Sequence, residues 1–313
     1  LDACRADVFE SVVNLDRYDD YHRLISLGSH SSEWTRRNFG HSQFADTVYV
    51  SANPHTTLLA NNTFHEIVEV WKSFECVPNM IPPRKLVKAA INAHKRHPHK
   101  RLIVHFMQPH GTGQLVEGNS TERDVYCRTV EAMQEFVFTL ASEIDGRTVV
   151  TADHGELFGE DDMLAHKYSM HNAVLHVPMV IQGIEGLRDE GLVQHADVVR
   201  TLVERAGGDA ETVQGVDLRE QRREYAISQS PQDSLDPLLA HNPDYDTSRY
   251  PAEPYSVIQD GEFKYLKRPD EPRLYQLPDE TENVIDEHPD VAEELDAELT
   301  GWLDTEGQQV GRG

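Results

Sequence analysis

Short runs of β-branched and other apolar residues alternate along most of the chain with longer stretches of helical periodicity. The predicted strands cover residues 47–51, 102–107, 148–151 and 177–182. The predicted helices cover residues 84–96, 121–143 and 193–205. Alternation at this spacing is typical of an α/β fold, with a mostly parallel central sheet flanked by helices. In such sheets the chemistry collects on loops at the carboxyl ends of the strands.

The last part of the sequence has a different character. Residues 229–254 are rich in Pro, Asp, Ser and Asn, which predicts a long loop. Strand patterns at 255–259 and 263–266 flank an Asp-Gly pair and predict an antiparallel hairpin, and an acidic amphipathic helix is predicted at 290–303. We therefore expect three parts: an α/β domain over 1–228, the loop over 229–254, and the hairpin, helix and tail over 255–313, packed on the same domain.

The chain is strongly acidic. Its 54 Asp and Glu residues against 29 Lys and Arg residues give a formal net charge of -25. This charge argues against a basic face that would bind nucleic acid. An acid-rich, lysine-poor composition suits concentrated salt, where screening removes self-repulsion. We therefore expect a protein of a high-salt cytosol, with an ordinary acidic cytosolic enzyme as the alternative.

The apolar runs, the cysteines and the first residues of the chain bear on its cellular compartment. No apolar run approaches the roughly 18 residues of a membrane-spanning helix. The three cysteines show no metal-ligand or disulfide spacing, which favours a reducing cytoplasm. The chain begins at Leu1 without Met, in a pattern resembling the end of a strand, so we expect a strand to precede it and leave export open. A homo-oligomer is also left open.

The clearest candidate for a chemical site follows the predicted strand at 148–151. Residues 151–156 are Thr-Ala-Asp-His-Gly-Glu, so an apolar strand ends in a carboxylate and an imidazole. Asp153 and His154 are therefore candidate ligands for a divalent cation. Asp2, near the start of the chain, could supply a further metal oxygen. The non-metal alternative for Asp153 is a turn with a capping Asp. For Asp2 it is the cap of a following helix.

These motifs together resemble the sulfatase-like branch of the alkaline phosphatase superfamily, including haloarchaeal sulfatase-like hydrolases. Asp2, Arg5 and Asp7 match an Asp-x-x-Arg-x-Asp start, and the Thr-Ala-Asp-His-Gly-Glu stretch follows in the family's order. Lys167 lies eleven residues before Pro178, as the family's anion-binding Lys lies before its Val-Pro strand. The resemblance covers nearly the whole chain.

Two more stretches agree with the family pattern. Residues 102–110 resemble a strand followed by a substrate-contacting His, here His110, and residues 274–283 resemble the family's closing Leu-Tyr-Asp-Leu segment. The resemblance implies the α/β fold above and a hydrolase that needs one divalent metal ion (Mn, Ca, Mg or Zn), held by Asp2 and the Asp-His pair. One departure is Ala3, where many sulfatases have a second Asp.

The second departure from the sulfatase pattern concerns the nucleophile. The motif that sulfatases convert to formylglycine, Cys/Ser-x-Pro-Ser-Arg, is absent, so no formylglycine is expected. The corresponding loop is residues 28–35, and it resembles relatives with an unmodified hydroxyl nucleophile. Ser31 is our first choice, then Ser32, then Ser29 or Thr35. A Ser-rich helix cap is the non-catalytic alternative for each of them.

The resemblance also implies residues that contact the substrate. Asn53 and His55 have the spacing at which sulfatases place a Lys and a His on the anion, and an Asn-Pro turn with an exposed His is the alternative. His166 and His171 flank Lys167 and are candidates for protonating a leaving group or for a second metal site. Lys167 and His110 are expected to act in catalysis. Arg5 is expected to contact substrate or to orient the metal ligands.

The function implied is hydrolysis of sulfate or phosphate esters through a Ser nucleophile and a covalent ester. A plain hydroxyl favours phosphorus over sulfur, and the substrate is expected to be a small-molecule or glycan ester. One alternative is a phosphodiesterase or phosphoglycerol-type transferase of the same superfamily. The other is a non-catalytic relative that binds an anion or a glycan.

Overall fold

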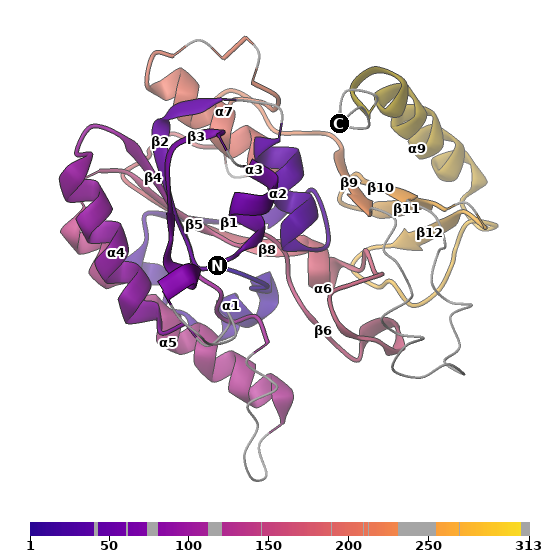
Figure 1. The fold of residues 1–313 in the computed structure, drawn as a ribbon. Coiled ribbons are helices and arrows are strands. Elements are labelled where there is room, and N and C mark those ends of the chain that lie inside the picture. The colour runs from indigo at the N-terminus through magenta and orange to yellow at the C-terminus, as the bar shows by residue number, and fades with distance from the viewer. Residues whose placement is uncertain are drawn as a thin grey trace.

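The computed structural model describes residues 1–40, 43–60, 62–73, 81–111, 121–144, 146–188, 190–208, 210–211, 213–230, 255–268 and 270–307. Their helices and strands form a larger α/β body and, beside it, a smaller C-terminal sheet with one helix (Figure 1).

One sheet of the α/β body is parallel. Its strands have the order β3 (Phe64–Glu69), β2 (Phe44–Ser51) and β4 (Arg101–His105). The second half of β2 is a continuous buried run, as expected for a strand covered on both faces. Ser51 lies opposite His105 in the register, so β2 and β4 end at the same edge.

The second sheet of the body is antiparallel. Its order is β1 (Asp20–Ile25), β8 (His176–Gln182) and β5 (Thr148–Thr151), with β8 antiparallel to both neighbours. The sequence did not indicate this direction, because strand–helix alternation alone does not fix how each strand is oriented.

The first residues of the chain lie between these two sheets. On one side, the Leu1 ammonium donates to Thr151 O at 2.8 Å, and the N–H of Asp153 donates to Leu1 O at 3.3 Å. On the other side, Asp2 forms a parallel bridge with Pro109. Asp2 is thereby fixed beside the carboxyl ends of both β4 and β5.

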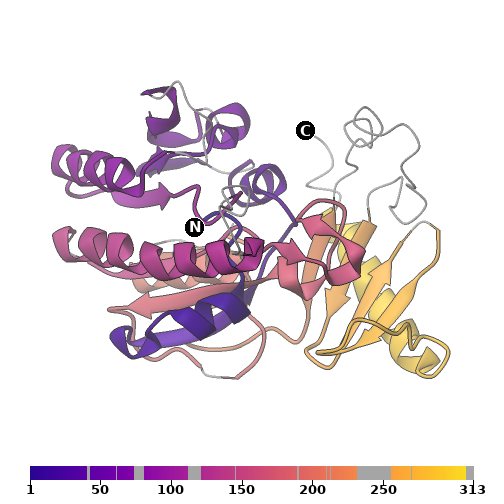
Figure 2. The same cartoon turned by 90° about the horizontal axis from the view of Figure 1, so that it is seen from below.

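Helices cover both faces of the parallel sheet. Val48 and Val50 pack under α4 (Pro83–Arg96), whereas Tyr49 points to the opposite face and packs with α2 (Ser31–Phe39). The long helix α5 (Glu122–Glu143) lies beside α4 (Figure 2).

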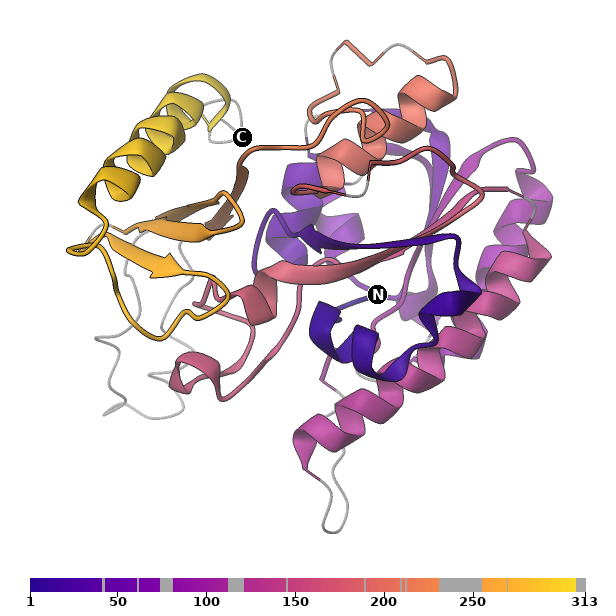
Figure 3. The same ribbon diagram turned by 180° about the vertical axis from the view of Figure 1, so that it is seen from behind.

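The remaining helices of the body complete the layers. They are α1 (Ala6–Val12), α3 (His55–Ala60), α6 (Asn172–Leu175) and α7 (His195–Arg205). α1 packs on α5 and β8, and α7 lies on the other side of the antiparallel sheet (Figure 3).

The C-terminal sheet has four antiparallel strands. In spatial order they are β12 (Arg273–Gln276), β11 (Phe263–Lys267), β10 (Tyr255–Gln259) and β9 (Ala226–Ser230). The helix α9 (Pro289–Trp302) buries Leu295 and Leu299 against it. This sheet meets the α/β body through a second apolar cluster that includes Ile25, Leu175 and Val257.

Several short elements connect the longer ones. They are η1 (Leu15–Arg17), η2 (Val70–Ser73), β6 (Leu157–Phe158), η5 (Glu160–Asp162), β7 (Leu164–Ala165) and the terminal turn η6 (Leu303–Gly307).

The predicted α/β fold with a helix-flanked parallel sheet is confirmed, and so is the C-terminal hairpin, here β10 and β11. The loop predicted at 229–254 falls on residues 231–254, outside the described residues, except that Gln229 and Ser230 end β9. Within the described ranges, no helix has the length and apolarity to cross a membrane.

Candidate active site

Three side chains meet between the ends of β4 and β5: Asp2, Asp153 and His154. None of them is more than 2% exposed. One ligand atom of each lies within 4.8 Å of the other two. His154 Nε2 is 3.8 Å from Asp2 Oδ1 and 3.6 Å from Asp153 Oδ2. The structure thus brings together the three residues predicted as metal ligands.

The carboxylate of Asp153 has one satisfied and one unsatisfied oxygen. Oδ1 accepts the backbone N–H groups of Ala3 at 3.1 Å and of His154 at 2.9 Å. Oδ2 is buried and, among the described residues, has no hydrogen-bond donor. A buried, unpaired carboxylate oxygen is costly, and a divalent cation would satisfy it. The donor set therefore fits a metal ion.

His154 is held in the tautomer that a metal ligand needs. Its Nδ1 donates to Gly155 O at 2.8 Å, which leaves the lone pair of Nε2 directed at the two carboxylates. Burial lowers the pKa of His154 and keeps the ring neutral. Gly155 is required beside it, because a Cβ there would lie 2.1 Å from Ala173 O.

Three side chains, those of Asn53, His110 and His105, lie against the carboxylate of Asp2. Asn53 Nδ2 donates to Oδ2 at 2.8 Å, His110 Nδ1 donates to Oδ1 at 2.7 Å, and His105 Nε2 is 3.3 Å from Oδ2. Burial would raise the pKa of Asp2, but His105 and His110 hold it well below its usual range. Burial also opposes protonation of His110, yet its bond to Asp2 raises its pKa to about 9.

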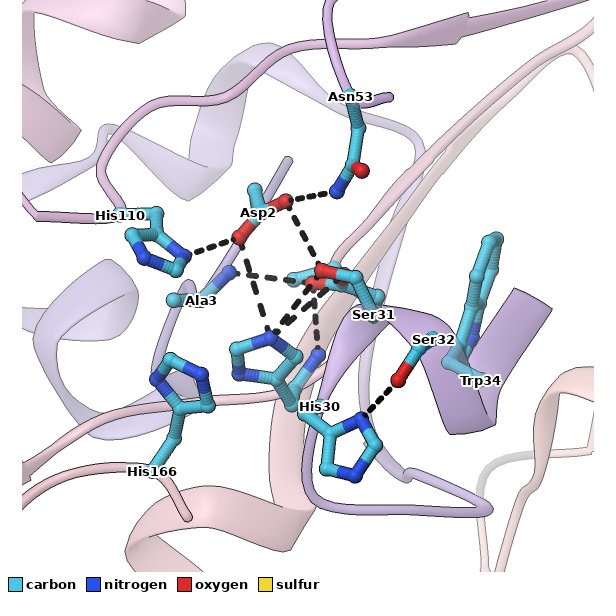
Figure 4. Close-up of polar contacts among 12 residues, drawn as sticks. Asp2, Ala3, His30, Ser31, Ser32, Trp34, Asn53, His110 and His166 are labelled. Carbon is cyan, nitrogen blue, oxygen red and sulfur yellow. Dashed lines mark hydrogen bonds and ion pairs between the residues drawn. The ribbon is translucent and has the colours of Figure 1, made fainter. Parts of the chain in front are cut away.

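Ser31 is the hydroxyl of its loop that faces this centre. Its Oγ donates to Asp2 Oδ2 at 3.1 Å and is 3.5 Å from His154 Nε2. Ser32 bonds His30 Nδ1 at 2.6 Å instead (Figure 4). Ser29 and Thr35 are buried, and neither hydroxyl has a hydrogen-bond partner in the part of the chain that the structure describes. Ser31 is also the first residue of α2, where the helix dipole favours negative charge.

His105 is not among the predicted site residues, although its ring lies close to both the Asp2 and the Asp153 carboxylates. Its Nε2 lies 3.7 Å from Asp153 Oδ2, and its Nδ1 is hydrogen-bonded to Tyr49 Oη at 2.9 Å. The predicted strand continued to Met107, which placed His105 inside the strand. In the structure β4 ends at His105, at the functional edge of the sheet.

His166 and Glu156 form a buried pair next to the centre. His166 Nδ1 lies 3.0 Å from Glu156 Oε1, and the His166 ring is 4.3 Å from that of His154, centroid to centroid. Burial, with the charge of His110, lowers the pKa of His166 to about 3. Burial raises the pKa of Glu156 to about 7. Glu156 belongs to the Thr-Ala-Asp-His-Gly-Glu motif but was not predicted to be a site residue.

Lys167 and His55, two further predicted residues, are exposed. Partial burial of the ring is the main cause that lowers the pKa of His55; the charge of Asp2 raises it, and that of Lys167 lowers it further. His55 therefore lies within electrostatic range of both groups. Asn53 connects it to the centre, since Asn53 Oδ1 accepts the N–H of His55 at 2.9 Å.

Two predicted substrate residues have other partners. The guanidinium of Arg5 makes a bidentate pair with Asp7 at 2.8 Å and also bonds Glu160 Oε1 at 2.7 Å. Neither Asp7 nor Glu160 is one of the three predicted metal ligands, and these pairs leave the guanidinium little capacity for an anion. His171 caps α6 by accepting the N–H of Ala173 at 3.0 Å, and its Nε2 lies 3.8 Å from Glu280 Oε1.

Comparison with known proteins shows the fold. No protein-family model matches the chain, and no curated protein sequence matches it. Solved structures do. A proposed sulfatase from Bacteroides thetaiotaomicron VPI-5482 has a TM-score of 0.73 at 13% identity, covering 97% of this chain and 90% of that one.

Two more solved structures agree. A phosphonate monoester hydrolase from Silicibacter pomeroyi has a TM-score of 0.67 at 14% identity, covering 96% of this chain and 93% of that chain. A 2-O GAG sulfatase also has a TM-score of 0.67, at 13% identity, covering 96% and 87%. The resemblance found in the sequence is confirmed at the level of structure: the chain has the fold of sulfatases and other members of the alkaline phosphatase superfamily.

Proposed function

We propose that this chain is a metal-dependent hydrolase of phosphate or sulfate esters, with Ser31 as the nucleophile and a covalent serine ester as the intermediate. The observation that carries the proposal is the position of Ser31 Oγ, 3.1 Å from Asp2 Oδ2 and 3.5 Å from His154 Nε2. The fold shared with sulfatases and a phosphonate monoester hydrolase supports it.

Asp2, Asp153 and His154 would hold one divalent cation. Two carboxylates and an imidazole are acceptable ligands for Mn, Mg, Ca and Zn. When bound, the cation would lower the pKa of the Ser31 hydroxyl and offset negative charge on the ester oxygens.

The residues of the chain supply the remaining chemistry. Ser31 Oγ forms a bond to phosphorus or sulfur while the bond from that atom to the leaving alcohol oxygen breaks. The Ser31 hydroxyl donates its hydrogen bond to Asp2 Oδ2, and its proton would pass to solvent water, because Asp2 is held in its ionised form. Water then attacks the serine ester, releases phosphate or sulfate, and restores the hydroxyl.

We assign the proton for the leaving oxygen to His110. Its side chain is 30% exposed, whereas those of His154 and His166 are 0% and 10% exposed, so a leaving group reaches His110 most readily. Its Nδ1 is held on Asp2 at 2.7 Å. A positioned imidazole of this kind contributes about 10²–10⁴-fold to rate.

We expect three groups to stabilise the anionic oxygens of the ester. They are the exposed side chains of Lys167 and His55 and the first N–H groups of α2, which form the positive end of a helix dipole. Asn53 acts indirectly, because its amide already holds Asp2.

A plain hydroxyl suits attack on phosphorus, so we expect phosphate esters of small molecules or glycans to be turned over faster than sulfate esters. The test is hydrolysis of a chromogenic phosphate monoester, phosphate diester and sulfate ester by the full chain in concentrated KCl, with Mn²⁺ or with a chelator. Ser31→Ala should lower the rate by at least about 10³-fold. Ser32→Ala, whose hydroxyl bonds His30, is the matched control and should retain activity.

Three other results of this experiment would change the assigned function. Full activity in Ser31→Ala, or in the chelator, would overturn the proposal. Release of the alcohol without inorganic phosphate when a polyol is added would identify a phosphate-group transferase. Folded, metal-loaded protein that binds phosphate without turning over any ester would indicate a binding protein.

A further inference from the structure

Three histidines from separate segments face one another beside the proposed metal site. His110 follows β4, His154 follows β5, and His166 follows β7. One ring nitrogen of each lies within 4.8 Å of the other two. The ring centroids are 4.3 Å apart for His154 and His166 and 5.0 Å apart for His110 and His166.

The hydrogen bonds of the three rings follow one pattern. Nδ1 of His110 is 2.7 Å from Asp2 Oδ1, Nδ1 of His154 is 2.8 Å from Gly155 O, and Nδ1 of His166 is 3.0 Å from Glu156 Oε1. Carboxylate and carbonyl oxygens accept hydrogen bonds, so each Nδ1 carries the proton. In the neutral form of each ring, Nε2 then has the lone pair, and a metal ion bound here would displace the second proton of His110. Histidines that ligate metals are oriented in this way by an outer oxygen acceptor.

The two possible donor sets differ in chemistry. Asp2, Asp153 and His154 offer mainly carboxylate oxygen, which suits Mn²⁺ and Mg²⁺. The three imidazoles offer only nitrogen, which suits Zn²⁺ and Co²⁺ in a four-coordinate site with one open position. His154 belongs to both sets, and only its Nε2 is available.

We propose that His110, His154 and His166 form a second metal site, selective for borderline transition metals such as Zn²⁺ or Co²⁺. Because both sites need the single lone pair of His154, occupation of one excludes occupation of the other. This proposal concerns binding alone and stands whether or not the chain hydrolyses esters.

Co²⁺ absorption monitors the three-histidine site, and Mn²⁺ resonance monitors the site of Asp2, Asp153 and His154. In the full chain, one equivalent of Co²⁺ should produce the visible absorption of four-coordinate cobalt, and Zn²⁺ should abolish it. His166→Gln should weaken Co²⁺ binding at least about tenfold, with loss of that absorption, and leave Mn²⁺ binding, followed by electron paramagnetic resonance, within about twofold. Asp153→Asn should weaken Mn²⁺ binding at least about tenfold and leave Co²⁺ binding within about twofold.

Two controls complete the experiment. His99→Gln removes an exposed histidine in the turn that follows α4 and should change neither signal. One equivalent of Zn²⁺ should release bound Mn²⁺ from the unmodified protein. Four-coordinate cobalt absorption that persists in His166→Gln, loss of Mn²⁺ binding together with Co²⁺ binding in that variant, or simultaneous binding of Zn²⁺ and Mn²⁺ would each overturn the proposal.

Discussion

Asn53 Nδ2 donates a 2.8 Å hydrogen bond to Oδ2 of Asp2, the same oxygen that accepts the hydroxyl of Ser31. Asn53 is 2% exposed, and its own Oδ1 is fixed by the N–H of His55. The amide therefore cannot rotate without breaking a second bond. It sets the plane of the Asp2 carboxylate, and with it the direction of both carboxylate oxygens and of the Ser31 hydroxyl.

The first prediction follows from this pair. Asn53→Ala should weaken Mn²⁺ binding by about 10–100-fold, because a ligand that loses its outer hydrogen bond is no longer oriented. Asn38→Ala is the matched control, since the Asn38 amide donates to the carbonyl of Trp34 within α2 and, among the described residues, does not contact Asp2. Binding is measured from the electron paramagnetic resonance of free Mn²⁺. Equal affinity in the two variants would contradict the role given to Asn53.

Local patterns predicted the parts of the site that depend on a single segment. Asp153 and His154 follow an apolar strand directly, so their place at its carboxyl end could be inferred from neighbouring residues. The pairing of Arg5 with Glu160 could not be inferred in this way, because Glu160, in η5, is far from Arg5 in the sequence. The role of His105 depends on which residue ends β4, and strand ends are the least certain feature of a sequence-based assignment. The direction of β8 depends on pairing with β1 and β5, which no local pattern specifies.

The second prediction concerns the glycine after His154. A Cβ on residue 155 would lie 2.1 Å from the backbone oxygen of Ala173, which cannot move independently. Gly155→Ala should therefore lower the free energy of unfolding by about 3 kcal/mol or more. Gly301→Ala is the control: nothing lies within 4 Å of its added Cβ, and in α9 it should stabilise by about 1 kcal/mol. Chemical denaturation of both variants tests this, and similar effects of the two substitutions would refute it.

The third prediction concerns pH. Burial lowers the pKa of His195 to about 4, while an unfolded histidine titrates near 6.5. The folded state therefore holds His195 neutral. The stability linked to it is fully present above about pH 6.5 and is lost as the pH falls towards 4, by about 3 kcal/mol in total.

His195→Gln removes this titration and keeps a donor for Ala152 O, which His195 Nε2 bonds at 2.9 Å. The free energy of unfolding, measured in chelator at pH 7.5 and 4.5, should fall less in this variant than in the unmodified chain. The chelator removes the pH dependence of metal binding from both proteins. Identical falls would show that His195 is not the group responsible.

The last prediction concerns a buried ion pair of the C-terminal part that also contacts the first residue of α6. Lys264, on β11, is 0% exposed; its ammonium forms an ion pair with Glu280 and also donates to Asn172 Oδ1 at 3.0 Å. Burial would raise the pKa of Glu280, but the charge of Lys264 lowers it below its usual range. Lys264→Met should cost about 3–5 kcal/mol of unfolding free energy, because it leaves the Glu280 carboxylate buried without a counter-charge.

The double variant Lys264→Met with Glu280→Gln distinguishes a lost charge balance from lost packing. The Gln side chain carries no charge, and its oxygen can still accept the N–H of Asn172, which Glu280 Oε1 now accepts at 2.8 Å. The double variant should therefore be more stable than Lys264→Met alone, with a coupling of about 1–3 kcal/mol. Additive losses in the cycle would mean that the two side chains contribute by packing and not as an ion pair. Lys267→Met, which removes a half-exposed lysine of the same strand, should cost about 1 kcal/mol or less.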